Sequence, residues 1–169
     1  GASDGPALMA ARTIADEGEF GLIAAVTSGL TMPNVVTVGP GDDCAVFAPT
    51  GQVVVSTDAL YEDVHFRKAW SGPHDVGRKA VGSALADVEA MGATPLGVVV
   101  ALSAPPETPT DWVLEFTKGV REECELAGAA LVGGDTTRGP AIGVVVTVFG
   151  DLHGRTPLLR SGARPGDVV

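Results

Sequence analysis

Cysteine and long apolar runs are both scarce in this sequence. Two cysteines, Cys44 and Cys124, are too few and too far apart for a disulfide framework or a zinc site, and we expect both thiols in the core. No apolar run approaches the roughly 18 residues of a membrane span, and residues 1–20 lack the basic start and apolar centre of a signal peptide. We therefore expect a cytoplasmic protein with no membrane partner.

Basic residues are also few, with 11 Lys and Arg against 21 Asp and Glu and a formal net charge of −10. This balance argues against nucleic acid and anionic membranes as partners, because both are polyanions. Any phosphate ligand would need cations brought with it. The 169 residues, 45% hydrophobic and 19% charged, are enough for one globular domain with a core of its own.

Apolar periodicity predicts the order helix, three strands, helix, strand, helix, two strands. The helices are expected at 16–30, 74–92 and 110–126, and the strands at 35–38, 44–47, 53–57, 96–102, 129–132 and 142–149. The run 96–102 is apolar throughout, which suits a strand buried on both faces. Residues 161–169 resemble the start of another strand. This order favours an α/β (α+β) sandwich in which helices cover a mixed sheet.

Acidic residues follow three of the predicted strands or their turns. They are Asp43 beside Asp42, Asp58, and Asp135. Each one alone is explained as a turn or capping residue. Together, and with the hydroxyls of Ser56, Thr57 and Thr136, they resemble an oxygen-ligand site for hard cations. Mg²⁺ fits better than Ca²⁺ because the acids are dispersed along the chain rather than gathered in one loop.

Asp87 lies, by helical spacing, at the edge of the apolar arc of the helix 74–92. A carboxylate pressed toward a core must be paired, hydrogen-bonded or metal-bound. A salt bridge to Lys79 or Arg78 would satisfy it without any function. A place in the metal site is the alternative.

The stretch GGDTTRGP, residues 133–140, is the candidate for phosphate contact. Neither G-x-x-x-x-G-K-[ST] nor G-x-G-x-x-G occurs, so a nucleotide would be held by another device. Gly133 and Gly134 form either a simple turn or a place where backbone amides approach phosphate, and Arg138 or Arg160 could donate to it. Several carboxylates would repel a phosphorylated substrate unless metal ions bridged them, which favours multi-metal phosphoryl chemistry.

These motifs resemble, in order and spacing, those of the thiamine-monophosphate kinase family in the AIR-synthase-like (PurM-like) superfamily. The stretches that carry the resemblance are GEFGLIA, GDDCAVF, VSTDAL followed by VHF, RKAVGSALADVEAMGATP, GGDTTRGP and GRTPLLRSGARPGD. The resemblance implies transfer of the ATP γ-phosphoryl group to thiamine monophosphate, giving thiamine diphosphate and ADP. It also implies that residues 17–169 form the N-terminal, ATP- and Mg²⁺-binding domain, with helices on one side of the sheet.

Residue roles follow from the resemblance, motif by motif. The implied Mg²⁺ ligands are Asp43, Ser56, Thr57, Asp58, Asp87 and Asp135, with Asp42 adjacent to them. Gly134, Asp135 and Arg160 would contact ATP, and His65, by spacing alone a structural or exposed residue, would contact thiamine monophosphate. A phosphate monoester is largely an oxyanion at neutral pH, so the reaction needs little help from a general base. In-line transfer between two polyanions is instead assisted by positioning and by several Mg²⁺ ions.

The resemblance also implies a homodimer, in which the sheet edge is used and the two sheets pair into a central barrel, and a second α/β domain after this one. Residues 1–16 are expected to be a flexible terminus or a cloning remnant. Since residues of the second domain that close over ATP and thiamine phosphate are missing, we expect little or no kinase activity from the 169-residue chain alone. The alternatives are an AIR synthase or selenophosphate synthetase type of enzyme, against which GGDTTRGP and VHF argue, and a non-catalytic Mg²⁺-binding dimerisation module.

Overall fold

The computed structural model describes residues 11–168, so most of the predicted flexible segment 1–16 lies outside the described residues. The elements are α1 (Ile14–Thr27), β1 (Val36–Val38), β2 (Val46–Phe47), β3 (Val53–Tyr61), α2 (Pro73–Ala90), β4 (Thr94–Ala104), α3 (Thr110–Leu126), β5 (Leu131–Arg138), β6 (Gly143–Asp151) and the short 3-10 helix η1 (Arg160–Gly162). The predicted order of helices and strands is confirmed. None of these helices has both the length and the apolar character needed to cross a membrane.

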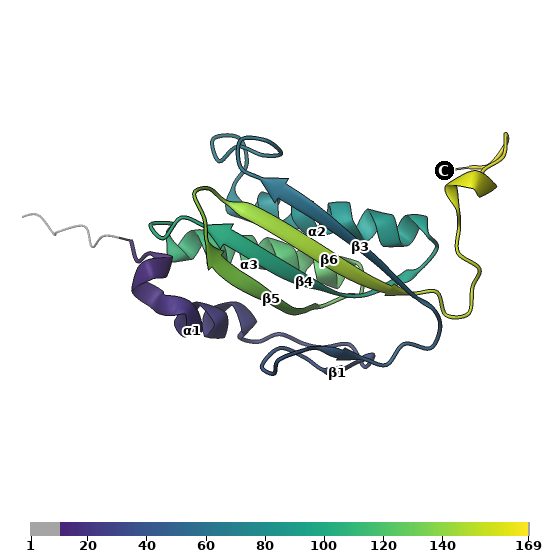
Figure 1. Ribbon diagram of the computed structural model, residues 1–169, viewed down its shortest axis with the longest axis horizontal. Helices are drawn as coiled ribbons and strands as arrows, with labels where there is room; N and C mark the ends of the chain where they lie inside the picture. The colour runs from purple at the N-terminus through teal and green to yellow at the C-terminus, as the bar shows by residue number, and fades with distance from the viewer. Residues whose placement is uncertain (1–10, 169) are drawn as a thin grey trace, which may run out of the picture.

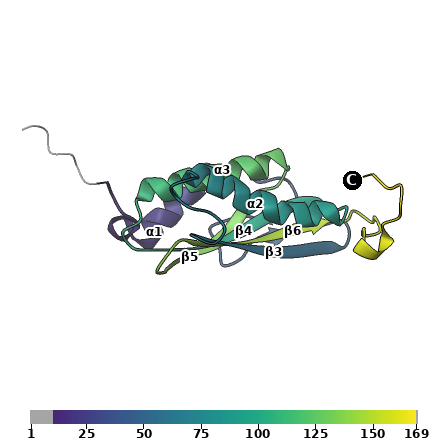
Figure 2. The same cartoon turned by 90° about the horizontal axis from the view of Figure 1, so that it is seen from above.

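The main sheet has four strands in the order β3-β6-β4-β5. The pairs β3/β6 and β4/β6 are antiparallel and the pair β4/β5 is parallel, so the sheet is mixed. Figures 1 and 2 show α2 and α3 side by side on one face of this sheet, with α1 beyond them. The prediction of an α/β sandwich with helices on one side of a mixed sheet is confirmed.

The core lies between the helices and one face of the sheet. Alternate residues of β6, Val144, Val146 and Val148, are fully buried there because strand side chains alternate between faces. The opposite face is largely open, and it leaves Val55 of β3 63% exposed. The prediction that strand 96–102 is buried on both faces is confirmed for residues 96–98, which are all buried, and is wrong at Ala101 of β4, which is exposed.

A small β1/β2 sheet covers only one end of the open face. Phe47 of β2 packs on Phe149 of β6 with ring centroids 5.5 Å apart. Val36 joins Val132 in a second, small apolar cluster. The neighbouring loop carries Cys44, whose side chain is exposed, so the prediction of two core thiols is right for Cys124 and wrong for Cys44.

Strands β3 and β5 are longer than the sequence predicts. Asp58 pairs with Val146 inside β3, and Asp135 pairs with Ala101 inside β5. The prediction that these acids follow their strands is therefore wrong. The stretch GGDTTR is a strand rather than a turn, because the neighbouring strand β4 supplies hydrogen-bond partners that outweigh local turn preference.

The segment after β6 also differs from its prediction. Up to residue 168 it contains no strand, but η1 and turns. The amide of Leu158 donates to the carbonyl oxygen of Met91 at 3.1 Å, which brings this segment against the end of α2. The predicted strand at 161–169 is therefore wrong for the described residues.

Asp151 is a fully buried carboxylate at the end of β6. Its oxygens accept from the Thr50 amide at 2.7 Å, the Thr50 hydroxyl at 3.1 Å and the His153 amide at 2.7 Å. Burial alone would raise the pKa of Asp151, but these hydrogen bonds and the nearby imidazole outweigh it, and the pKa lies below its ordinary value. The carboxylate thus joins the turn before β3 to the turn after β6.

We expect the Asp151→Asn substitution to lower Tm at pH 7 by about 5 °C or more. Because the folded-state pKa lies below the unfolded value of about 3.9, ionised Asp151 stabilises the fold above that pH and loses its effect as pH falls through the folded-state pKa. The Tm difference from the parent, measured by circular dichroism, should therefore shrink below about pH 4. Asp63→Asn, at an exposed turn, is the control. A difference that is constant down to pH 2 would contradict this role.

Candidate functional site

The clearest polar pair among the candidate residues joins β3 to α2. The Ser56 hydroxyl donates to Oδ2 of Asp87 at 2.6 Å. Beside this pair lies a pocket of ≈ 560 Å³ to which Arg160 also contributes. Its lining residues are Val54, Val55, Ser56, Asp87, Val88, Ala90, Met91, Leu158, Leu159 and Arg160. The structure thus brings together three predicted site residues from β3, α2 and the segment after β6.

Asp87 is exposed, so the expectation that its carboxylate presses toward the core is wrong. Neither cation considered as its partner pairs with it. Nε of Arg78 lies 2.8 Å from Oε2 of Glu123, and Lys79 donates to the carbonyl oxygen of His65. Only the Ser56 hydroxyl bonds the Asp87 carboxylate among the described side chains.

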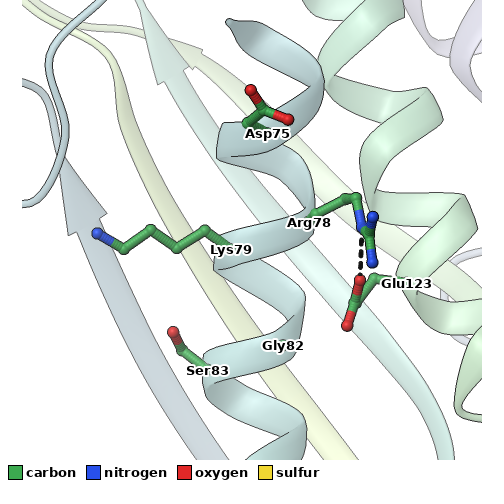
Figure 3. Close-up of a pocket in the computed structure, with 6 residues that line it drawn as sticks. All are labelled: Asp75, Arg78, Lys79, Gly82, Ser83 and Glu123. Atoms are coloured by element: carbon green, nitrogen blue, oxygen red, sulfur yellow. Dashed lines mark hydrogen bonds and ion pairs between the residues drawn. The ribbon is translucent and has the colours of Figure 1, made fainter. Parts of the chain in front are cut away.

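Figure 3 shows the surface of α2 that carries both cations. This surface and Glu123 of α3 form a pocket of ≈ 540 Å³, which is lined by Asp75, Arg78, Lys79, Gly82, Ser83 and Glu123. Arg78 turns toward Glu123 on α3, while Lys79 extends from the helix in another direction. The hydrogen bond and charge of Glu123 raise the pKa of Arg78. Arg78 therefore serves the contact between α2 and α3.

Asp58 and Thr57 lie on opposite faces of β3. Asp58 shares the helix-facing side with Ser56, two residues before it, and is half-buried. The Thr57 hydroxyl is on the open face, where it donates to the carbonyl oxygen of Val146 at 3.3 Å and lies 3.1 Å from the Thr147 hydroxyl. The Thr57 side chain is therefore not gathered with Ser56 and Asp58.

The remaining candidate ligands lie in other parts of the fold. Asp43 is exposed in the loop between β1 and β2, where its amide donates to Asp42 at 2.8 Å. Gly134 and Asp135 are on β5, at the opposite edge of the sheet from β3, roughly 14 Å away at three strand spacings. Within residues 11–168, no three His, Cys, Asp or Glu side chains lie close enough to hold a metal ion.

The close packing of β5 against β4 explains why residue 134 is a glycine. A Cβ at this position would lie 2.0 Å from the carbonyl oxygen of Val100 on β4, so only glycine allows the two backbones to approach. Gly133 has more room, since its Cβ would meet a side-chain carbon of Val99 at 3.7 Å. The simple-turn explanation of the Gly-Gly pair is wrong, and the close approach of β4 and β5 accounts for the second glycine.

His65 lies in the loop that follows β3. Its Nδ1 accepts from the Tyr61 amide at 3.1 Å. The loop is fixed by Glu62, which pairs with Lys68 at 2.8 Å and accepts from the Ile142 amide at 3.2 Å. Partial burial opposes ionisation, yet these partners hold the pKa of Glu62 below its usual value. No pattern in the sequence indicates that Glu62 supports this loop. The four-residue spacing of Lys79, Ser83 and Asp87, by contrast, does indicate that these three residues lie in one row along α2.

Comparison with known protein families shows which family the chain belongs to. Residues 41–152, more than half of the chain, match the family model described as AIR synthase related protein, N-terminal domain. The chain belongs to the AIR synthase related family.

Similar proteins extend the comparison. The thiamine-monophosphate kinase of Mycobacterium tuberculosis is 48% identical over 158 residues, which are 93% of this chain and 47% of that protein. The crystal structure of thiamine-monophosphate kinase from Stenotrophomonas maltophilia K279a is 38% identical with a TM-score of 0.63, and covers 76% of this chain and 39% of that one. A structure described as AaThiL complexed with AMPPCP and TMP is 28% identical with a TM-score of 0.58, over 84% and 44%. The chain spans about half the length of the curated relatives it matches.

In this AIR synthase related domain, the pocket beside Ser56 combines three kinds of polar group. The Arg160 guanidinium has donors that match phosphate oxygens. The Asp87 carboxylate and the Ser56 hydroxyl are oxygen ligands of the kind that hard cations prefer. The arrangement is suited to a phosphate ligand accompanied by a divalent cation.

Proposed function

We propose that this domain takes part in the ATP-dependent phosphorylation of thiamine monophosphate to thiamine diphosphate, as the N-terminal part of a thiamine-monophosphate kinase. The observation that carries the proposal is the pocket shared by Ser56, Asp87 and Arg160. It occurs in a chain 48% identical to a protein of that name. The residues that line it unite an anion-binding cation with oxygen ligands for a metal.

Mg²⁺ is part of the proposal because the candidate ligands supply oxygen atoms only. Ser56, Asp58 and Asp87 would hold a first ion at the β3/α2 edge. Asp43 and Asp135 lie elsewhere in the single chain, so they would ligate Mg²⁺ that arrives with the nucleotide. When bound, Mg²⁺ would neutralise phosphate charge and hold the γ-phosphate for in-line attack. Thr57 could contribute only through main-chain atoms, because its hydroxyl faces the other side of the sheet.

Nucleotide and acceptor are assigned to different residues. Arg160, Asp135 and the backbone at Gly134 would contact ATP. His65 would contact the phosphate of thiamine monophosphate, and the loop that holds it leaves the side chain exposed. No general base is required, since the acceptor phosphate is already largely ionised at neutral pH.

A homodimer and a cytoplasmic location complete the proposal. The open face of the sheet carries Val53, 51% exposed, and Val55, 63% exposed, on the edge strand β3. A second copy placed against this face would remove apolar area from water and cover the edge strand. A cytoplasmic location is proposed because ATP is the phosphoryl donor.

A coupled ADP-release assay tests the function. With ATP and Mg²⁺ present, we expect release of ADP that depends on thiamine monophosphate from a longer form of the protein, and little from the 169-residue chain. His65→Ala should raise the KM for thiamine monophosphate about tenfold and leave the KM for ATP within about twofold, as the loss of one hydrogen bond to a charged ligand predicts. If the longer form released ADP at the same rate with and without thiamine monophosphate, this substrate would be ruled out. Equal effects of His65→Ala on both substrates would remove its assigned role.

A further inference from the structure

The contact that carries a new inference joins α2 to the loop after β3. Nζ of Lys79 donates to the carbonyl oxygen of His65 at 2.6 Å. Lys79 is exposed and in the second turn of α2, and it has no carboxylate partner among the described ion pairs. A lysine that gives its ammonium to a main-chain oxygen restrains that stretch of backbone, because the charged donor makes a strong hydrogen bond.

The ring of His65 has a defined tautomer in this loop. Its Nδ1 accepts from the Tyr61 amide at 3.1 Å, so Nδ1 carries no proton. The neutral imidazole must then carry its proton on Nε2. The His65 amide donates to the Tyr61 carbonyl oxygen at 2.8 Å, and Phe66, the next residue, is buried. An exposed Nε2–H is therefore available to an anionic ligand.

Lys79 links this loop to the other half of the candidate site. Lys79, Ser83 and Asp87 follow one another at four-residue spacing and lie on one side of α2. At one end of this row Asp87 accepts from Ser56 of β3, and at the other end Lys79 donates to His65, which follows β3. The two ends are roughly 12 Å apart along the helix at 1.5 Å per residue. One helix thus fixes the positions of both the oxygen-ligand pair and the histidine.

We propose that Lys79 is a positioning residue that acts through His65. By holding the His65 carbonyl oxygen, it keeps the loop in the one conformation in which Nδ1 accepts from Tyr61 and Nε2–H is presented to a phosphomonoester. The identity of that ligand as thiamine monophosphate rests on the proposed function. The restraint on the imidazole tautomer does not depend on it.

Long-range ¹H–¹⁵N NMR spectra of the histidine rings test the restraint in the 169-residue chain. In the parent chain we expect His65 as a single Nε2–H tautomer. Lys79→Met should release the loop and raise the fraction of the Nδ1–H tautomer, whereas Lys79→Arg, which keeps a charged donor, should preserve the parent spectrum. Lys118→Met removes the same charge from α3, where Lys118 pairs with Glu115, and should change nothing at His65. A His65 spectrum that Lys79→Met leaves unchanged would overturn the proposal.

Titration with thiamine monophosphate separates this inference from the proposed function. In the parent chain the ligand should shift the His65 Nε2 resonance, and Lys79→Met should weaken that binding about tenfold, as the loss of one oriented hydrogen bond predicts. Binding of ATP with Mg²⁺ should stay within about twofold, because Lys79 does not line the pocket of Ser56 and Asp87. If Lys79→Met changes the tautomer but neither the 169-residue chain nor a longer form of the protein responds to the ligand, the substrate assignment fails and the restraint stands. If the parent binds the ligand and Lys79→Met binds it equally well, the positioning role fails.

Discussion

Replacing Gly119 with alanine is expected to destabilise the protein by about 2–3 kcal/mol, although alanine is the better helix former by about 1 kcal/mol. Gly119 lies in α3, where a Cβ would meet the carbonyl oxygen of His74 at 2.0 Å and the backbone nitrogen of Arg78 at 3.1 Å. These are atoms of α2 that cannot turn aside, so the two helices must separate and the core beneath them must loosen. Urea unfolding at one fixed protein concentration measures the free energy.

Gly82→Ala is the matched control on α2. A Cβ there would meet only the carboxylate end of Glu123, at 3.3 Å, and that flexible side chain can move. We expect this variant to be neutral or slightly more stable than the parent, because helix propensity then acts without a clash. Equal free energies of unfolding for Gly119→Ala and Gly82→Ala would mean that α2 and α3 do not pack as closely as the structure has them.

The close approach of α2 and α3 also excludes a side chain at Gly77. A Cβ at Gly77 would lie 2.2 Å from the carbonyl oxygen of Phe116, on the other side of the α2/α3 contact. Because one separation of the helices relieves both clashes, the double variant with Gly119→Ala should lose less stability than the sum of the two single variants. These glycines show how sequence and packing are linked in this domain, since the lack of a side chain at both positions lets the backbones of α2 and α3 approach closely.

Local sequence patterns were sufficient for the order of elements but not for the extent of the strands. The stretch GGDTTR has the residues of a turn, and its local preferences favour one. It becomes part of β5 because β4 lies beside it in space, with Ala101 in register with Asp135. Ala101 lies more than thirty positions earlier in the chain, so no local sequence pattern can indicate this pairing. The predicted strand at 161–169 has no such neighbour up to residue 168, and none forms.

The candidate site, too, could be predicted from the sequence only in part. Motif resemblance selected Ser56, Asp87 and Arg160, which the structure places around one pocket. The helical pattern put Asp87 at the edge of the apolar arc, but it could not show that this edge of α2 lies over the outermost strand β3. Because β3 is the edge strand of this sheet within residues 11–168, the carboxylate reaches solvent instead of the core. Sheet order is likewise invisible in the sequence, and it places Asp58 and Asp135 on opposite edge strands. Their side chains also lie on opposite faces, since Asp135 is in register with Ala101 and Asp58 is on the helix-facing side of β3.

Asp87→Asn is expected to weaken the binding of ATP in the presence of Mg²⁺ by about a hundredfold, because Asp87 is proposed to hold the first Mg²⁺ ion, which would bridge the domain to the triphosphate. The asparagine keeps the shape of the side chain and an oxygen for the Ser56 hydroxyl, so the pair at 2.6 Å in the parent can still form. What is lost is the negative charge on which attraction of the divalent cation depends. Isothermal calorimetry of ATP binding measures the effect, and Asp75→Asn, an exposed acid of the same helix, removes the same charge away from the pocket.

Repeating the titration without Mg²⁺ decides between a metal role and a general electrostatic role. Without the cation, the Asp87 carboxylate faces the triphosphate only as a like charge beside Arg160, so Asp87→Asn should bind ATP as well as the parent or somewhat more tightly. The sign of the effect should therefore reverse when Mg²⁺ is added. A variant that binds ATP equally with and without Mg²⁺, and as well as the parent, would contradict metal bridging at Asp87. A loss of the same size in both conditions would mean that the substitution disturbs the pocket itself, and the oxygen ligands would then have to be sought among Asp43, Asp58 and Asp135.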